Sequence, residues 1–174
     1  MFTTIHFKLN NKQMNFLYFI FPLLFITSCN SSDDTVIPEE VEIIETLDQA
    51  EVVSVSVNGN ENNYTFSVGI LSTETGCDQY ANWWEVISED GSELIYRRIL
   101  GHSHINEQPF IRSGGAVEIS NNQTVIIRAH MNTSSFGTKV YKGTVASGFS
   151  AFTLEDDFAT NLETQEPLPT SCAF

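Results

Sequence analysis

A His-x-His motif followed by a glutamate is the part of this chain whose residue types and spacing could do chemistry. His102 and His104 are two residues apart, so on a β-strand both imidazoles would point to one face and could ligate one ion. Glu107 follows within reach, and His130 lies on another expected strand. Three imidazoles with an open fourth position are typical of catalytic zinc sites, and the same ligands suit copper, iron or nickel. One hypothesis is therefore a metal-binding β-domain, with zinc as the first candidate and enzymatic if the open position is used.

The same residues also fit a purely structural role. Histidines at strand ends can bond to backbone groups or pack on aromatic rings, and Glu107 can pair with Arg112 or Arg97. No serine stands in a nucleophile-elbow motif, and no glycine-rich loop precedes a helix. We therefore expect no catalytic residues and no cofactor, and we favour a non-catalytic binding or structural domain over the metal hypothesis.

Two pairs of adjacent residues on the expected strands raise the question of which member of each pair is buried. Trp83 and Trp84 must face opposite ways, so one fills the core and the other lies under a loop or is exposed, where it could stack on a ligand. Arg97 and Arg98 are also adjacent, so one of the two must face inward or lie at a sheet edge. A buried arginine needs a partner, and the candidates are Glu85 and Glu118.

The strands that place these side chains can be located from the alternation of apolar and polar residues, which has a period of two. This alternation predicts strands near 52–57, 64–70, 82–87, 94–100, 116–119, 124–131 and 139–145, and no helix. We expect one all-β domain over 52–174, a single antiparallel β-sandwich with an irregular tail from residue 159. A tryptophan on the third strand resembles the core of immunoglobulin-like and fibronectin-III-like modules, while a jelly roll or a closed barrel is the alternative.

The three cysteines divide into one near the N-terminus and two in the domain. Cys77 and Cys172 both stand among loop-forming residues, Gly76-Cys77-Asp78 and Thr170-Ser171-Cys172. Once the N-terminal cysteine is set aside, two cysteines remain in an exported domain. This even number predicts one disulfide bond, which would tie the C-terminal tail to the body.

The N-terminal segment has the parts of an export signal. Lys8 and Lys12 precede an apolar run over 16–28, which is too short and too interrupted to span a membrane. The run ends in Ile26-Thr27-Ser28-Cys29, which resembles the lipobox of bacterial lipoproteins. The resemblance implies that 1–28 is a cleaved signal peptide and that Cys29 carries acyl chains such as palmitate.

An acidic tether, 29–51, would then join the anchor to the domain. Its start, Ser31-Ser32-Asp33-Asp34, resembles the lipoprotein export signal of the Bacteroidetes group, which implies an outer-membrane or cell-surface location. Without Lys8 and Lys12, six basic residues remain against 22 acidic ones, a formal net charge of −16. Such a charge excludes nucleic acid as a partner and leaves the lipid anchor as the membrane contact. A glycan, a peptide or another envelope protein remains as the expected ligand.

Overall fold

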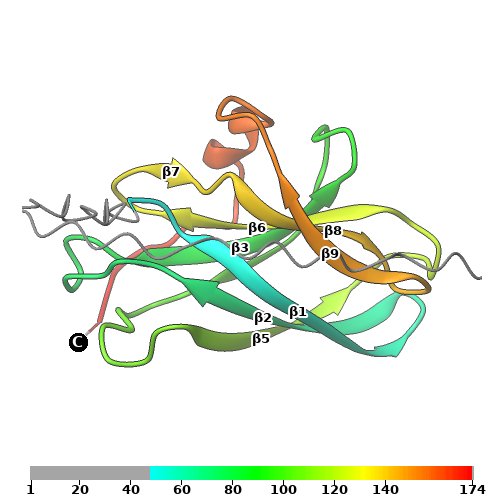
Figure 1. Cartoon of the computed structure of the whole chain (residues 1–174), viewed down its shortest axis with the longest axis horizontal. Helices are drawn as coiled ribbons and strands as arrows, with labels where there is room; N and C mark the ends of the chain where they lie inside the picture. Colours follow the sequence, from blue (N-terminus) through cyan, green and yellow to red (C-terminus); the bar gives the residue numbers. More distant parts are fainter. Residues whose placement is uncertain (1–47, 174) are drawn as a thin grey trace, which may run out of the picture. The chain divides into compact units, whose positions relative to one another are not determined.

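Two antiparallel sheets face each other in the computed structural model, which describes residues 48–173 (Figure 1). The strands are β1 (Glu51–Asn60), β2 (Asn63–Leu71), β3 (Ala81–Ser88), β4 (Leu94–Ile99), β5 (Phe110–Val117), β6 (Val125–Met131), β7 (Ser135–Phe136), β8 (Lys139–Thr144) and β9 (Gly148–Thr153). One sheet has the order β1-β2-β5, and the other has the order β4-β3-β6-β8-β9, with β7 paired to β6. The predicted β-sandwich is confirmed, and the two separate sheets exclude a closed barrel.

The core between the sheets follows from the alternation in the sequence. Tyr64, Phe66, Val68 and Ile70 of β2 are all buried, and they share one hydrophobic cluster with Trp84 of β3. Full burial of one such side chain contributes about 1.5–3 kcal/mol. All of these residues belong to one compact unit, residues 43–174, which therefore has its own core.

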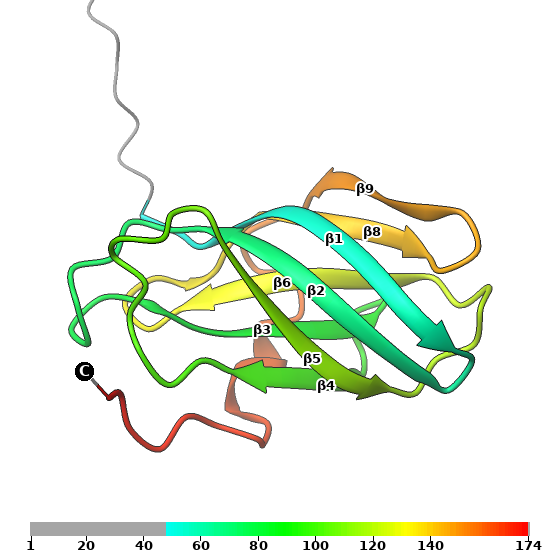
Figure 2. The same cartoon turned by 90° about the horizontal axis from the view of Figure 1, so that it is seen from below.

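The middle of the second sheet is covered on both faces, which is why β3 and β6 are buried along almost their whole length. Residues 154–173, here called the C-terminal strap, run along its outer face and contain one short helix, η1 (Thr160–Thr164). Leu162 of the strap packs with Ile87 and Ile126 in a second buried cluster. The tail predicted to be irregular is therefore a cover for the sheet (orange-red to dark red in Figure 2).

Both ends of the described chain lie at one end of the sandwich. Ser134 donates a hydrogen bond to the carbonyl of Asp48, and the N–H of Ala173 donates to the carbonyl of Gly101 (2.7 Å). The turns at 61–62, 89–93 and 145–147 lie at the opposite end (Figure 1). Within residues 48–173 no helix is long and apolar enough to cross a membrane.

Candidate functional site

The predicted disulfide between Cys77 and Cys172 is confirmed. The two Cα atoms are 5.6 Å apart, and the sequence separation is 95 residues. The bond fastens the end of the C-terminal strap to the loop between β2 and β3. Cys29, the expected lipidation site, lies outside the described residues, as do the signal-like segment and most of the tether.

His102 and His104 lie in the loop between β4 and β5, and their ring centres are 4.5 Å apart. His102 is exposed, whereas the ring of His104 is buried and stacks on Phe110 at 3.9 Å. The buried carboxylate of Glu74 holds this loop, since it accepts hydrogen bonds from the backbone N–H of His104 and, at 2.8 Å, from the hydroxyl of Ser103. The same-face argument for strands is wrong here because the motif is not on a strand.

Glu107 and His130 are occupied elsewhere. Glu107 forms an exposed ion pair with Arg112 (2.8 Å). His130 lies on β6, where its ring stacks on Trp83 with centres 3.6 Å apart. Among residues 48–173 no group of three or more His, Cys, Asp or Glu side chains is placed to hold a metal ion. The four-residue metal set is therefore not assembled: His130 takes part in a buried polar cluster and His102 and His104 lie in a separate loop.

The environment of His130 favours a neutral ring. Its Nδ1 lies 2.7 Å from Oδ1 of Asn82 and its Nε2 lies 2.9 Å from Oε1 of Glu163. Burial lowers the pKa of His130 to about 4, and the nearby guanidinium groups of Arg97 and Arg128 act in the same direction, against the opposing effect of Glu163. A neutral ring has one N–H, which donates to the carboxylate of Glu163, and its other nitrogen then accepts from the side-chain amide of Asn82.

Neither tryptophan is placed to stack on a ligand. Trp84 fills the core and is fully buried, and Trp83 is 3% exposed on the outer face of the second sheet. Trp83 contacts the ring of His130 and the guanidinium of Arg97, which lies 4.5 Å from its ring centre. Both rings are packed inside the protein, so neither presents an exposed face for the ligand-stacking role considered from the sequence.

A buried Arg–Glu–Arg cluster fastens the strap to the sheet. The carboxylate of Glu85 accepts a hydrogen bond from Nε of Arg97 (2.7 Å) and one from Nε of Arg128 (2.8 Å), and all three side chains are at most 1% exposed. Arg97 also donates to the carbonyl of Leu162 (2.7 Å), and Arg128 donates to that of Phe158 (2.8 Å). The sequence identified Glu85 as a candidate partner. The buried member of the adjacent arginine pair is Arg97, which lies on the outer face of the sheet under the strap, and Arg98 is exposed.

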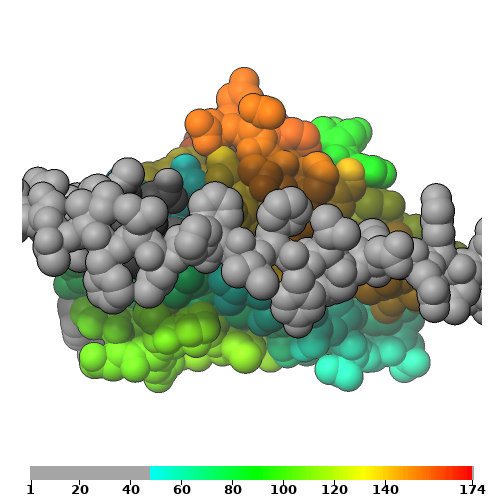
Figure 3. Space-filling view, viewed as in Figure 1, coloured from blue at the N-terminus to red at the C-terminus, as the bar shows by residue number. Residues whose placement is uncertain are grey.

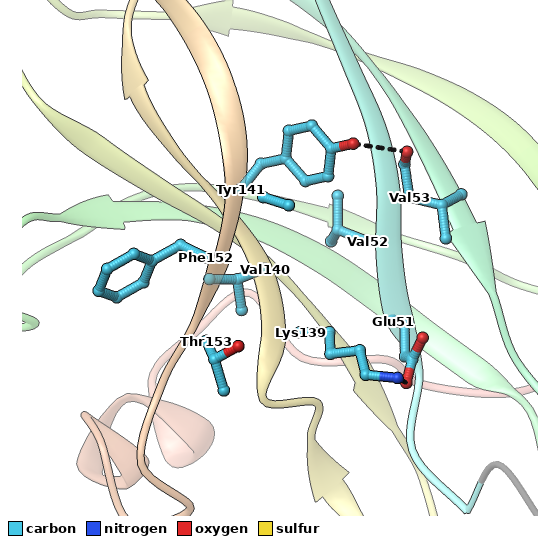
Figure 4. Close-up of a pocket in the computed structure, with 9 residues that line it drawn as sticks. Glu51, Val52, Val53, Lys139, Val140, Tyr141, Phe152 and Thr153 are labelled. Atoms are coloured by element: carbon cyan, nitrogen blue, oxygen red, sulfur yellow. Dashed lines mark hydrogen bonds and ion pairs between the residues drawn. The ribbon is translucent and has the colours of Figure 1, made fainter. Parts of the chain in front are cut away.

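The fold also forms an open groove that no motif indicated. It has a volume of about 540 Å³ and lies between β1, β8 and β9 (Figure 4). The hydroxyl of Tyr141 donates to the carbonyl of Val53 (2.7 Å) on its floor, and Lys139 pairs with Glu51 (2.7 Å) at one end. Phe152 of β9 lies at the margin of the groove and is 45% exposed, and its ring points away from β1 in Figure 4, where Nζ of Lys142 is 5.1 Å from the ring centre.

Strand β9 beside this groove ends the second sheet, and among the described residues no strand pairs with its outer edge. Its sequence, Gly-Phe-Ser-Ala-Phe-Thr, has no charge and no proline, and five of its six residues are exposed. The orange segment that includes the end of β9 stands out from the described surface in Figure 3. An edge of this composition lacks the features that usually prevent another strand from pairing with it.

Comparison with known proteins gives one similar protein and no fold relative. A protein of Halomicrobium mukohataei described as "Putative lipoprotein" is 34% identical over 93 residues, which are 52% of this chain and 45% of that protein. The chain thus matches about half the length of that protein. No family model matches the chain. No solved structure matches it.

Proposed function

We propose that this protein is an exported lipoprotein, anchored through Cys29 at the outer membrane or cell surface, that presents its β-sandwich as a non-catalytic binding module. The signal-like segment ending at Cys29 supports the anchor. The likeness to the Halomicrobium protein described as a lipoprotein supports the same class. The Cys77–Cys172 disulfide supports export, because such bonds form and persist in oxidising compartments.

The observation that carries the binding role is the groove beside the free edge of β9. The buried polar groups on the outer face of the second sheet are already used in packing: Glu85 binds two arginines, and His130 contacts Asn82 and Glu163. The groove, by contrast, is open, and its aliphatic and aromatic side chains lie next to an unpaired strand edge, with the Lys139–Glu51 ion pair at one end. The chemistry of this surface fits an extended peptide segment of a partner, which would pair with β9 through its backbone and place side chains against Phe152.

The arrangement of strands supports an immunoglobulin-type module. The first, second and fifth strands share one sheet, and the third, sixth and eighth share the other, as strands A, B, E and C, F, G do in immunoglobulin domains. Strand β4 pairs with β3 instead of joining the first sheet. In this comparison β9 is an addition at the edge of the second sheet, so the proposed binding surface lies on a strand outside the immunoglobulin-type set.

Peptide selection tests the binding surface. Peptides selected from a random display library on residues 43–174 should bind a Phe152→Asp variant at least about tenfold more weakly, because a charge enters the apolar contact. Ile111→Asp is the matched control, since Ile111 is 60% exposed on β5 of the other sheet. Selected peptides that bind both variants as tightly as the original protein would show that the groove is not the binding surface.

Whole-cell accessibility tests the location. Protease added to intact cells should digest the domain, and replacement of residues 31–34 by alanine should protect it, because that segment resembles the surface-export signal. Equal digestion of both proteins would contradict a role for this segment. Protection of the original protein in intact cells, with digestion after lysis, would contradict surface display.

A further inference from the structure

The ring of His104 is a buried polar group without a partner. The residue is 3% exposed, and neither Nδ1 nor Nε2 has a hydrogen-bond partner among residues 48–173. An unpaired polar group at a buried position is destabilising, and buried polar side chains in native proteins nearly always have partners. The two unpaired nitrogens therefore point to a group that completes the site.

The surroundings hold this ring in place. Phe110 stacks on it with the two planes within 12°, so the ring faces are used in packing and the ring edge carries the free nitrogens. The buried carboxylate of Glu74 accepts hydrogen bonds on both sides of the peptide link, from Ser103 and from the backbone of His104. The ring cannot turn out to water without breaking these contacts. A ligand must therefore come to the ring where it is.

His102 provides a second imidazole at a suitable distance. A metal ion bound to an imidazole nitrogen at about 2.0–2.1 Å lies about 3 Å from the ring centre, so rings whose centres are 4.5 Å apart are within reach of one ion. Both residues line a hollow of about 230 Å³ formed by residues 102–107, which has room for the waters of a bound ion. The two nitrogens of His104 are covered in the ion-free protein, so an ion must enter between the two rings.

We propose that His102 and His104 together bind one divalent transition-metal ion of the class that prefers imidazole, such as Zn²⁺ or Cu²⁺. Because the described residues hold no third His, Cys, Asp or Glu ligand, water completes the coordination and the site is open. Affinity should follow the usual order for nitrogen ligands, with Cu²⁺ bound more tightly than Zn²⁺. This site is separate from the groove beside β9, and it does not depend on the binding role proposed above.

Calorimetric titration of residues 43–174 without a histidine tag, first with Zn²⁺ and then with Cu²⁺, tests the site. One ion per chain is expected. The His102→Ala variant should bind at least about tenfold more weakly, since even residues that only orient a metal ligand change affinity by 10–100-fold. Asn106→Ala is the matched control, because Asn106 is exposed and lines the same hollow. No binding at millimolar Zn²⁺, or equal binding by His102→Ala, would overturn the proposal.

A His104→Phe variant separates metal binding from a packing role. Phenylalanine keeps the stack on Phe110 and removes the two unpaired nitrogens, so the metal-free variant should melt at a higher temperature than the original protein. The same variant should bind Cu²⁺ more weakly, and the electron paramagnetic resonance spectrum of any Cu²⁺ that remains bound should lack the splitting from two imidazole nitrogens. Retention of that splitting in His104→Phe would overturn the assignment.

Discussion

Removal of the Glu85 charge should cost the domain a large share of its stability. Glu85 lies between Arg97 and Arg128 with no exposed side-chain surface. Replacement by glutamine keeps the shape of the side chain and removes one negative charge. Both guanidinium groups would stay buried, held by backbone carbonyls of the strap that include those of Leu162 and Phe158.

The charge balance of the cluster sets the magnitude. With His130 neutral, the charges of Arg97 and Arg128 are balanced by Glu85 and by nearby Glu163. Glu85→Gln leaves one buried positive charge unbalanced. Breaking a buried ion pair by removing one partner typically costs about 3–5 kcal/mol, against a total of about 5–15 kcal/mol for a domain.

Urea unfolding of oxidised residues 43–174, followed by tryptophan fluorescence, measures this cost. Glu107→Gln is the matched control, because the same chemical change then affects an ion pair whose side chains are 29% and 59% exposed. The control should lose at most about 1 kcal/mol. If Glu85→Gln loses no more than the control, with an unchanged dependence on urea, then the cluster does not hold the strap by buried charge and the reasoning is refuted.

Three further changes test the strap and its neighbours. Replacement of Cys77 and Cys172 by serine should lower the free energy of unfolding, measured in urea, by about 4.7 kcal/mol in the chain-entropy model; a loss below about 1 kcal/mol would contradict that model here. Leu162→Ala should lower the free energy of unfolding by about 2–4 kcal/mol, because Leu162 is 2% exposed in the second buried cluster. A thermal midpoint equal to that of the original protein would contradict this. Burial lowers the pKa of His130 to about 4, so the unfolded chain binds more protons than the native one below about pH 6.5, and stability should fall by on the order of 3 kcal/mol between pH 6.5 and 4. His130→Gln should flatten this decline without abolishing it, since the pKa of His104 is lowered too; an unchanged slope would contradict the assignment.

The half-buried strands could be predicted from the sequence because one face of each packs on the core. Alternation located most of β2, and Asp90-Gly91 marked the turn between β3 and β4, where Gly91 has a φ of 71°. Most of β5 was missed, since Gly114 interrupts its pattern. Gly114 lies against Trp84 and Tyr96, where an added Cβ would come within 2.6 Å of the tyrosine hydroxyl.

Other features had no periodic signal to find. Strand β9 is exposed on most of its residues, so burial imposes no alternation on it. The histidines were predicted to converge because side chains two residues apart on a strand point to the same face. His102 and His104 instead lie in a loop, and His130 packs under the strap. The unpaired nitrogens of His104 could be found only once Phe110 and Glu74 were seen to hold the ring in place.

The mass of the mature protein tests the proposed anchoring most directly. Protein purified in detergent from membranes of its own host, or of a host that processes its signal, should begin at residue 29, and its first residue should carry a diacylglyceryl thioether and acyl groups. A Cys29→Ser variant should carry no lipid and leave the membrane fraction. A mature chain that begins elsewhere, or that begins at Cys29 with a free thiol, would contradict the proposal that this β-sandwich is held at the membrane by a lipid on Cys29.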